Sequence, residues 1–74
     1  MPRLPVVSGA ETVRALERLG IVVAGQRGSH NVMRRGSSGC VVPAHNELTT
    51  GTLNGVLKQA DVAAEEFIGA LRAE

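Results

Sequence analysis

The stretch that decides the fold is residues 21–42, which contain Ile21-Val22-Val23-Ala24, Gly25-Gln26-Arg27-Gly28-Ser29, His30-Asn31-Val32-Met33-Arg34, Gly36-Ser37-Ser38-Gly39 and Cys40-Val41-Val42. The first, third and fifth segments are rich in side chains that favour strands. The second and fourth consist largely of residues that form turns, and Pro43 ends the last strand. The stretch therefore predicts two successive hairpins and a three-stranded antiparallel meander.

A helix is predicted before the meander. Ser8-Gly9-Ala10-Glu11 has the form of a capping box, in which serine and glutamate each accept a free amide of the first turn. Val13, Leu16 and Leu19 then recur at helical spacing, and Gly20 suits a helix stop. We therefore expect a helix over residues 8–19.

Two further helices are predicted after the meander. Either Thr49 or Thr50 can cap the first, Asp61 interrupts the pattern, and the last, short helix begins near residue 64. Their apolar stripes are Leu53, Val56, Leu57 and Ala60, followed by Ala64, Phe67, Ile68 and Leu71. The order helix, three strands, helix, helix predicts one α+β domain over residues 1–74, with helices packed on one face of the sheet.

Composition excludes several classes of protein. The 74 residues are 43% hydrophobic and 20% charged, which is typical of a globular domain rather than a disordered tail. The chain has no run of 18 apolar residues, and its start lacks a signal-peptide pattern, so we expect a cytoplasmic protein that does not contact membranes. One cysteine allows no internal disulfide, and an aromatic content of 1% argues against base stacking on aromatic platforms.

The charge is divided unevenly along the chain. Residues 1–46 carry six arginines against two glutamates, a net charge of +4, whereas residues 47–74 carry a net charge of −3. A basic half of this kind can bind phosphates, although ordinary scatter in a small protein explains it equally well.

The segment from Gly25 to His30 is the most informative for function. Its glycines allow a tight turn or a close approach by another molecule, and His30 follows where a strand begins to fix side chains. Alternation along the strand places His30, Val32 and Arg34 on one face, so that His30 and Arg34 can address one anion. An ordinary hairpin with a surface histidine is the alternative, and the Gly-x-x-Gly match to RNA-binding KH domains is weak.

Other candidate groups are few. His45 follows Pro43 in a loop, and the amides at the Thr49 to Thr52 helix start can hold a phosphate, although such caps mostly serve the helix itself. Cys40 with a histidine base is a possible nucleophile, but a small buried strand residue is the commoner role. The two histidines and Cys40 lack zinc-site spacing, so we expect no metal site and no cofactor.

Six segments taken together resemble the HicA family of toxins, in the family's order and over nearly the whole chain. They are Pro5-Val6-Val7-Ser8-Gly9, Leu19-Gly20-Ile21-Val22-Val23, Gln26-Arg27-Gly28-Ser29-His30, Val42-Pro43-Ala44-His45, Gly51-Thr52-Leu53 and Leu57-Lys58-Gln59-Ala60. The resemblance implies an mRNA interferase of a type II toxin–antitoxin module, a fold like the double-stranded RNA-binding domain, and a HicB antitoxin that blocks the site.

The resemblance also assigns roles to residues. It implies that His30, the histidine of the Gly-Ser-His motif, is catalytic, and it leaves His45 as a secondary candidate. Two departures from the family pattern are the short second turn and the loss of basic residues at Asn46, Glu47, Thr49 and Thr50, which would weaken RNA affinity.

Together these observations lead to one hypothesis, a metal-independent endoribonuclease with His30 as general base. The residues expected to contact RNA or phosphate are Arg27, Gly28, Ser29, Arg34 and Arg35. Two alternatives are a non-catalytic module that resembles double-stranded RNA binders in fold alone, and a regulatory partner that folds stably only with its antitoxin.

Overall fold

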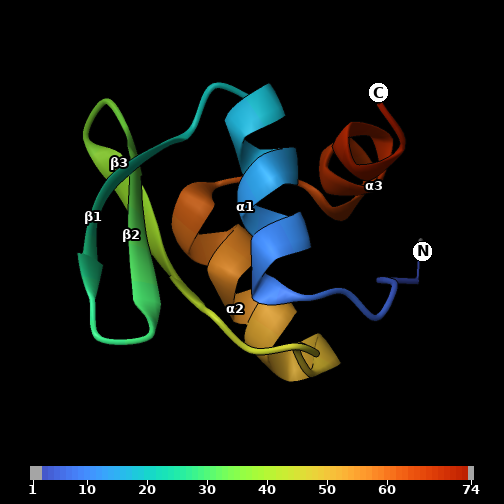
Figure 1. The fold of residues 1–74 in the computed structure, drawn as a ribbon. Coiled ribbons are helices and arrows are strands. Elements are labelled where there is room, and N and C mark those ends of the chain that lie inside the picture. Colours follow the sequence, from blue (N-terminus) through green and yellow to red (C-terminus); the bar gives the residue numbers. More distant parts are fainter. Residues whose placement is uncertain (1–2, 74) are drawn as a thin grey trace.

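The computed structural model describes residues 3–73 and contains three helices and one three-stranded sheet (Figure 1). The elements in chain order are α1 (Gly9–Arg18), β1 (Val22–Arg27), β2 (His30–Arg35), β3 (Ser38–Pro43), α2 (Thr50–Ala60) and α3 (Ala64–Arg72). This order confirms the predicted α+β fold, an α-β-β-β-α arrangement like that of double-stranded RNA-binding domains with α3 added. None of these helices is long and apolar enough to cross a membrane.

Both ends of α1 form as predicted. The Ser8 hydroxyl accepts from the Glu11 amide at 3.0 Å, and the Glu11 carboxylate accepts from the Ser8 amide at 2.9 Å, which completes the capping box. At the other end Gly20 has a φ of +88°, and the amides of Gly20 and Ile21 donate to Glu17 and Leu16. This is a Schellman stop, so Ile21 belongs to the helix ending and not to the strand predicted for it.

The sheet has the order β1-β2-β3, and both strand pairs are antiparallel. The closing pairs Arg27↔His30 and Arg35↔Ser38 leave turns of only two residues. Each turn begins with a glycine of positive φ, +56° at Gly28 and +59° at Gly36, as a type II′ hairpin requires.

The predicted turns were therefore too long. Gly25, Gln26 and Arg27 belong to β1, and β3 begins at Ser38 rather than at Cys40. Gly39 lies within the ladder as the partner of Arg34, and a Cβ there would lie 2.8 Å from the Met33 carbonyl oxygen, a distance that Cβ atoms essentially never show. Glycine at this position therefore permits close strand approach and does not mark a turn.

The helices cover only one face of the sheet, as predicted. In Figure 1 all three lie on the same side of β1, β2 and β3, with α1 and α2 nearest the sheet and α3 on the side of α1 that faces away from the sheet. The core between these layers includes Leu16, Ile21, Met33, Val42, Leu53, Leu57 and Phe67. The stripe of α2 is buried as predicted, whereas α3 buries Phe67 and Ala70 and leaves Ala64, Ile68 and Leu71 half-buried.

A set of backbone contacts joins the start of α1 to the loop after β3. The Gly9 amide donates to the His45 carbonyl at 2.8 Å, and the Leu48 amide donates to the Val7 carbonyl at 2.8 Å. The backbone at Gly9 passes so close to the Pro43 carbonyl that a Cβ would collide with it. The same loop reaches the first hairpin, because the Ala44 amide donates to the Ser29 carbonyl at 2.7 Å.

Candidate active site

The candidate site lies on the face of the sheet that none of the described helices covers. The strand register places its residues in three rows, which are Arg27, His30 and Pro43, then Gly25, Val32 and Val41, then Val22, Arg34 and Gly39. The other face presents Met33, Cys40 and Val42 to the core. The predicted alternation of β2, with His30, Val32 and Arg34 on one side, is confirmed.

His30 is the first residue of β2 and is exposed. Its partner across the hairpin is Arg27, and directly opposed side chains of this kind have Cβ atoms about 5 Å apart. A shallow depression of about 450 Å³ runs from this pair along the sheet, lined by Arg27, His30, Val32, Arg34 and Val41. An imidazole and two guanidinium groups therefore share one open surface that carries no carboxylate among its lining residues.

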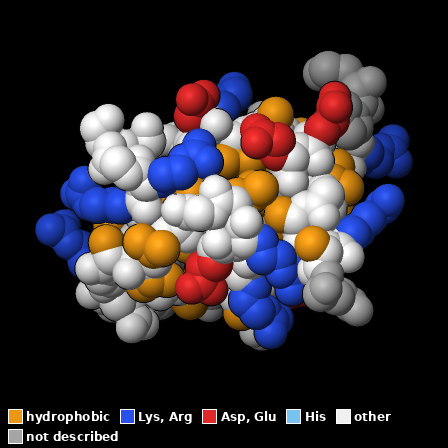
Figure 2. All heavy atoms as spheres, turned by 90° about the horizontal axis from the view of Figure 1, so that it is seen from above, with side chains coloured by type: hydrophobic (Ala, Val, Ile, Leu, Met, Phe, Trp, Pro, Cys, Tyr) orange, Lys and Arg blue, Asp and Glu red, His pale blue; other side chains and the backbone are white. Residues whose placement is uncertain are grey.

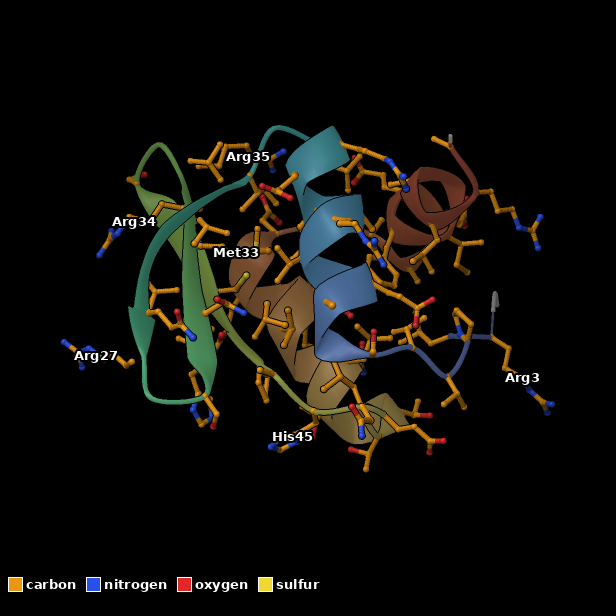
Figure 3. All side chains as sticks on the ribbon, in the orientation of Figure 1. Arg3, Arg27, Met33, Arg34, Arg35 and His45 are labelled. Atoms are coloured by element: carbon orange, nitrogen blue, oxygen red, sulfur yellow. The ribbon has the colours of Figure 1, made fainter. Side chains whose placement is uncertain are left out.

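Arg27 belongs to this surface, but not from the turn in which the sequence predicted that it would contact phosphate. The segment from Gly25 to Ser29 was expected to be a flexible turn, whereas the structure holds Arg27 in β1 opposite His30. In Figure 3 the Arg27 and Arg34 side chains both project away from the sheet on the side opposite the helices. Val41 lines the same depression and was not predicted from the sequence, because only the register of β3 on β2 places it beside Val32.

Arg35 does not join this group. It lies on the other side of β2, and its Nη1 donates to the Leu19 carbonyl at 3.3 Å, at the end of α1. A cation near the C-terminal end of a helix interacts favourably with the helix dipole, so this contact is structural. Of the predicted phosphate-binding arginines, the structure brings Arg27 and Arg34 to the site of His30 and leaves Arg35 on the opposite face.

Gly28 and Ser29 form the turn between Arg27 and His30. The Gln26 side chain donates to the Gly28 carbonyl at 3.3 Å, and the Ser29 carbonyl accepts from Ala44. These contacts hold the turn from both sides and fix the point at which His30 enters the strand.

His45 is exposed in the loop between β3 and α2. Its carbonyl accepts from Gly9, and Figure 3 places it at the end of the molecule where the β1–β2 turn lies. The ladder of β2 and β3 continues to Ser29 and Ala44, so His45 comes one residue beyond the paired region. It does not line the depression that contains His30.

The basic half of the sequence is not one surface. Figure 3 shows Arg3 on the side of the molecule opposite Arg27 and Arg34, and Arg18 donates to the Ala70 carbonyl of α3 at 2.8 Å. In Figure 2 the Lys and Arg side chains are spread over the visible face, with Asp and Glu between them. The net charge of +4 therefore overstates the basic charge on the candidate surface, which contains Arg27 and Arg34.

The remaining candidates lie elsewhere. Cys40 is buried on the inner face of the sheet, and burial raises the pKa of its thiol, which disfavours the reactive thiolate. The Thr49 hydroxyl accepts from the Thr52 amide at 3.2 Å and so serves the start of α2. Within residues 3–73 no three His, Cys, Asp or Glu side chains are grouped closely enough to hold a metal ion.

The fold and the site define a small protein like the double-stranded RNA-binding domain, with a histidine and two arginines on its open sheet face. Residues 9–62 match the family model described as HicA toxin of bacterial toxin-antitoxin. The chain therefore belongs to the HicA family of toxins from toxin–antitoxin systems, and this family implies a HicB-type antitoxin as the partner. No curated protein and no solved structure matched the chain.

Proposed function

We propose that this toxin is an mRNA interferase, a metal-independent endoribonuclease in which His30 is the general base. The observation that supports the proposal most directly is the position of His30, at the first residue of β2 in a depression that also contains Arg27 and Arg34. An exposed imidazole is suited to proton transfer, and the arginines supply permanent positive charge.

The chemistry follows from the structure of RNA. His30 accepts the proton of the ribose 2′-hydroxyl, the 2′-oxygen attacks the adjacent phosphorus, and the bond from phosphorus to the 5′-oxygen breaks. The products are a 2′,3′-cyclic phosphate and a 5′-hydroxyl, whose proton comes from water or from His45 as the secondary candidate. Arg27, directly across from His30, stabilises the negative charge that develops on the phosphoryl oxygens. The family's HicB-type antitoxin would inhibit the toxin by covering this face.

A non-catalytic RNA-binding module is the second candidate. The observation that favours it is that no hydrogen bond within the described residues holds the His30 imidazole, whereas catalytic bases are commonly oriented by a third group. Such a module would bind RNA through the same face and leave it intact.

One experiment separates the two candidates. Labelled single-stranded RNA is incubated with the protein and with His30→Ala, each with and without a chelator, and the products are analysed for a 2′,3′-cyclic phosphate end. We expect the wild type to cleave in both conditions and His30→Ala to be slower by about 10²–10⁴-fold, the usual contribution of a general base. His30 is exposed, so the variant should retain the wild-type circular dichroism spectrum.

Unchanged cleavage by His30→Ala would remove the catalytic assignment, and cleavage that required added Mg²⁺ would contradict the metal-independent mechanism. Binding without cleavage by the wild type would favour the second candidate.

A further inference from the structure

We propose that the open sheet face carries two separate phosphate subsites, so that one RNA strand lies along β2 from the His30 end to the Arg34 end. In this arrangement Arg27 contacts the scissile phosphate beside His30, and Arg34 contacts a different phosphate of the same strand. The inference rests on the proposed nuclease function and specifies its substrate as single-stranded RNA that spans several nucleotides.

His30 and Arg34 lie far apart along β2. His30 and Arg34 are four residues apart on β2, and a strand rises about 3.4 Å per residue, so their Cα atoms are separated by about 14 Å. Arg27 lies in the row of His30, whereas Arg34 lies in the row of Val22 and Gly39. Figure 3 shows the two arginine side chains at separate levels along the sheet.

The spacing of phosphates in extended RNA matches the separation of the two rows. Six covalent bonds join successive phosphorus atoms, the same number as in two residues of protein backbone, and two extended residues reach about 7 Å. The separation of the two rows therefore corresponds to two nucleotide units. The guanidinium group of Arg34 is placed to meet the phosphate two positions from the scissile phosphate.

The surface between the two rows is apolar and open. Val32 and Val41 form an apolar floor, with Val41 41% exposed, and Gly25 beside them has no side chain. A Cβ built at Gly25 meets nothing within 4 Å, so the space above this row is open. An extended strand can pass over such a floor through contacts with ribose and base surfaces. A rigid duplex would instead need contacts spread across two strands of phosphates.

The test uses a dinucleotide and a hexanucleotide of RNA. The dinucleotide contains only the scissile phosphate, whereas the hexanucleotide has two phosphates on each side of its central one. We expect Arg34→Gln to lower hexanucleotide cleavage by about tenfold or more, as loss of one charge-assisted contact does, and to leave dinucleotide cleavage within about twofold of wild type. Arg27→Gln should lower both.

Two further variants sharpen the result. Arg14→Gln removes the same charge from the exposed surface of α1, away from this face, and should change neither rate. Gly25→Glu places a carboxylate in the middle row without a clash, so it should slow the hexanucleotide and spare the dinucleotide. An equal loss on both substrates with Arg34→Gln would overturn the two-subsite proposal while leaving the catalytic role of His30 intact.

Binding gives a readout that does not depend on cleavage. With a 2′-deoxy hexanucleotide, Arg34→Gln should reduce the slope of log affinity against log salt by about 0.7, the value for one phosphate contact on a single strand. An unchanged slope, or a duplex that competes as well as the single strand, would overturn the proposed path. An unchanged salt dependence of binding in Arg34→Gln would refute the two subsites. Unchanged cleavage by His30→Ala would instead refute the nuclease mechanism, so the two failures are distinguishable.

Discussion

Gly9→Ala adds a single methyl group, and this addition should destabilise the whole protein. The added Cβ would overlap the Pro43 carbonyl oxygen, which is backbone and cannot rotate away. The approach is close because the Gly9 amide donates to the His45 carbonyl at 2.8 Å, so relieving the overlap also lengthens this hydrogen bond. Overpacking typically costs about 1–3 kcal/mol and a weakened hydrogen bond about 1 kcal/mol, so we expect a loss of about 2–4 kcal/mol.

This loss is large for a chain of 74 residues. At about 0.05–0.15 kcal/mol per residue, the total free energy of unfolding is about 4–11 kcal/mol. A domain of this size loses about 4–8 °C of Tm per kcal/mol, so Gly9→Ala should lower Tm by about 8–32 °C. The assay is thermal unfolding followed by circular dichroism, with urea unfolding as an independent measure of the free energy.

Gly55→Ala is the matched control. Gly55 is exposed within α2, and a Cβ there meets nothing within 4 Å. The same methyl group should therefore raise stability by about 0.5–1 kcal/mol, because alanine favours helix more than glycine does. The reasoning is refuted if Gly9→Ala unfolds within 2 °C of wild type, or if the two variants shift Tm in the same direction.

Two further predictions concern the helix starts. Thr49→Ala should lower the free energy of unfolding by about 1 kcal/mol because it removes the cap of α2, whereas Thr50→Ala should have little effect, and equal effects in urea unfolding would contradict the assignment. Hydrogen bonds from Ser8 lower the pKa of Glu11, so its contribution is present above the ordinary glutamate pKa and is lost as the pH falls through the lowered folded-state value. Glu11→Gln should reduce this acid-side fall in Tm, and identical pH profiles would count against it.

Local patterns predicted the helix ends well because the groups involved lie within a few residues of one another. The capping box needs only Ser8 and Glu11, and the stop at Gly20 needs only the preceding turn. Local reasoning failed where a residue's role depends on a partner strand. Gly25 and Gly39 are residues typical of turns, yet they lie in β1 and β3. The neighbouring strand passes close to Gly39, whereas the space beside Gly25 is open, and neither property can be read from the local sequence.

The candidate site shows the same division. Alternation within β2 was sufficient to place His30, Val32 and Arg34 on one face, since period two is a property of a single strand. Arg27 was predicted to contact phosphate from a turn, but its position opposite His30 required the register of β1 on β2. Val41 could not be added without the register of β3 on β2. The excess of basic charge in the first half was misleading for a related reason, because a sum over the sequence ignores that Arg3 and Arg18 lie beside other elements.

The site therefore depends on the fold for its position but contributes little to the stability of the fold. His30 is positioned by a series of backbone contacts. The start of α1 at Gly9 holds the loop that follows β3, and the Ala44 amide in this loop donates to the carbonyl of Ser29, the residue before His30. The side chains on the open face are exposed or half-buried and lie outside the core. Substitutions at Arg27, His30 or Arg34 should thus lower the proposed RNA cleavage at nearly constant stability, whereas Gly9→Ala should lower both the stability and the proposed activity. A toxin of this size can separate its folding residues from those of its proposed active site because a sheet has two faces and the helices cover only one of them.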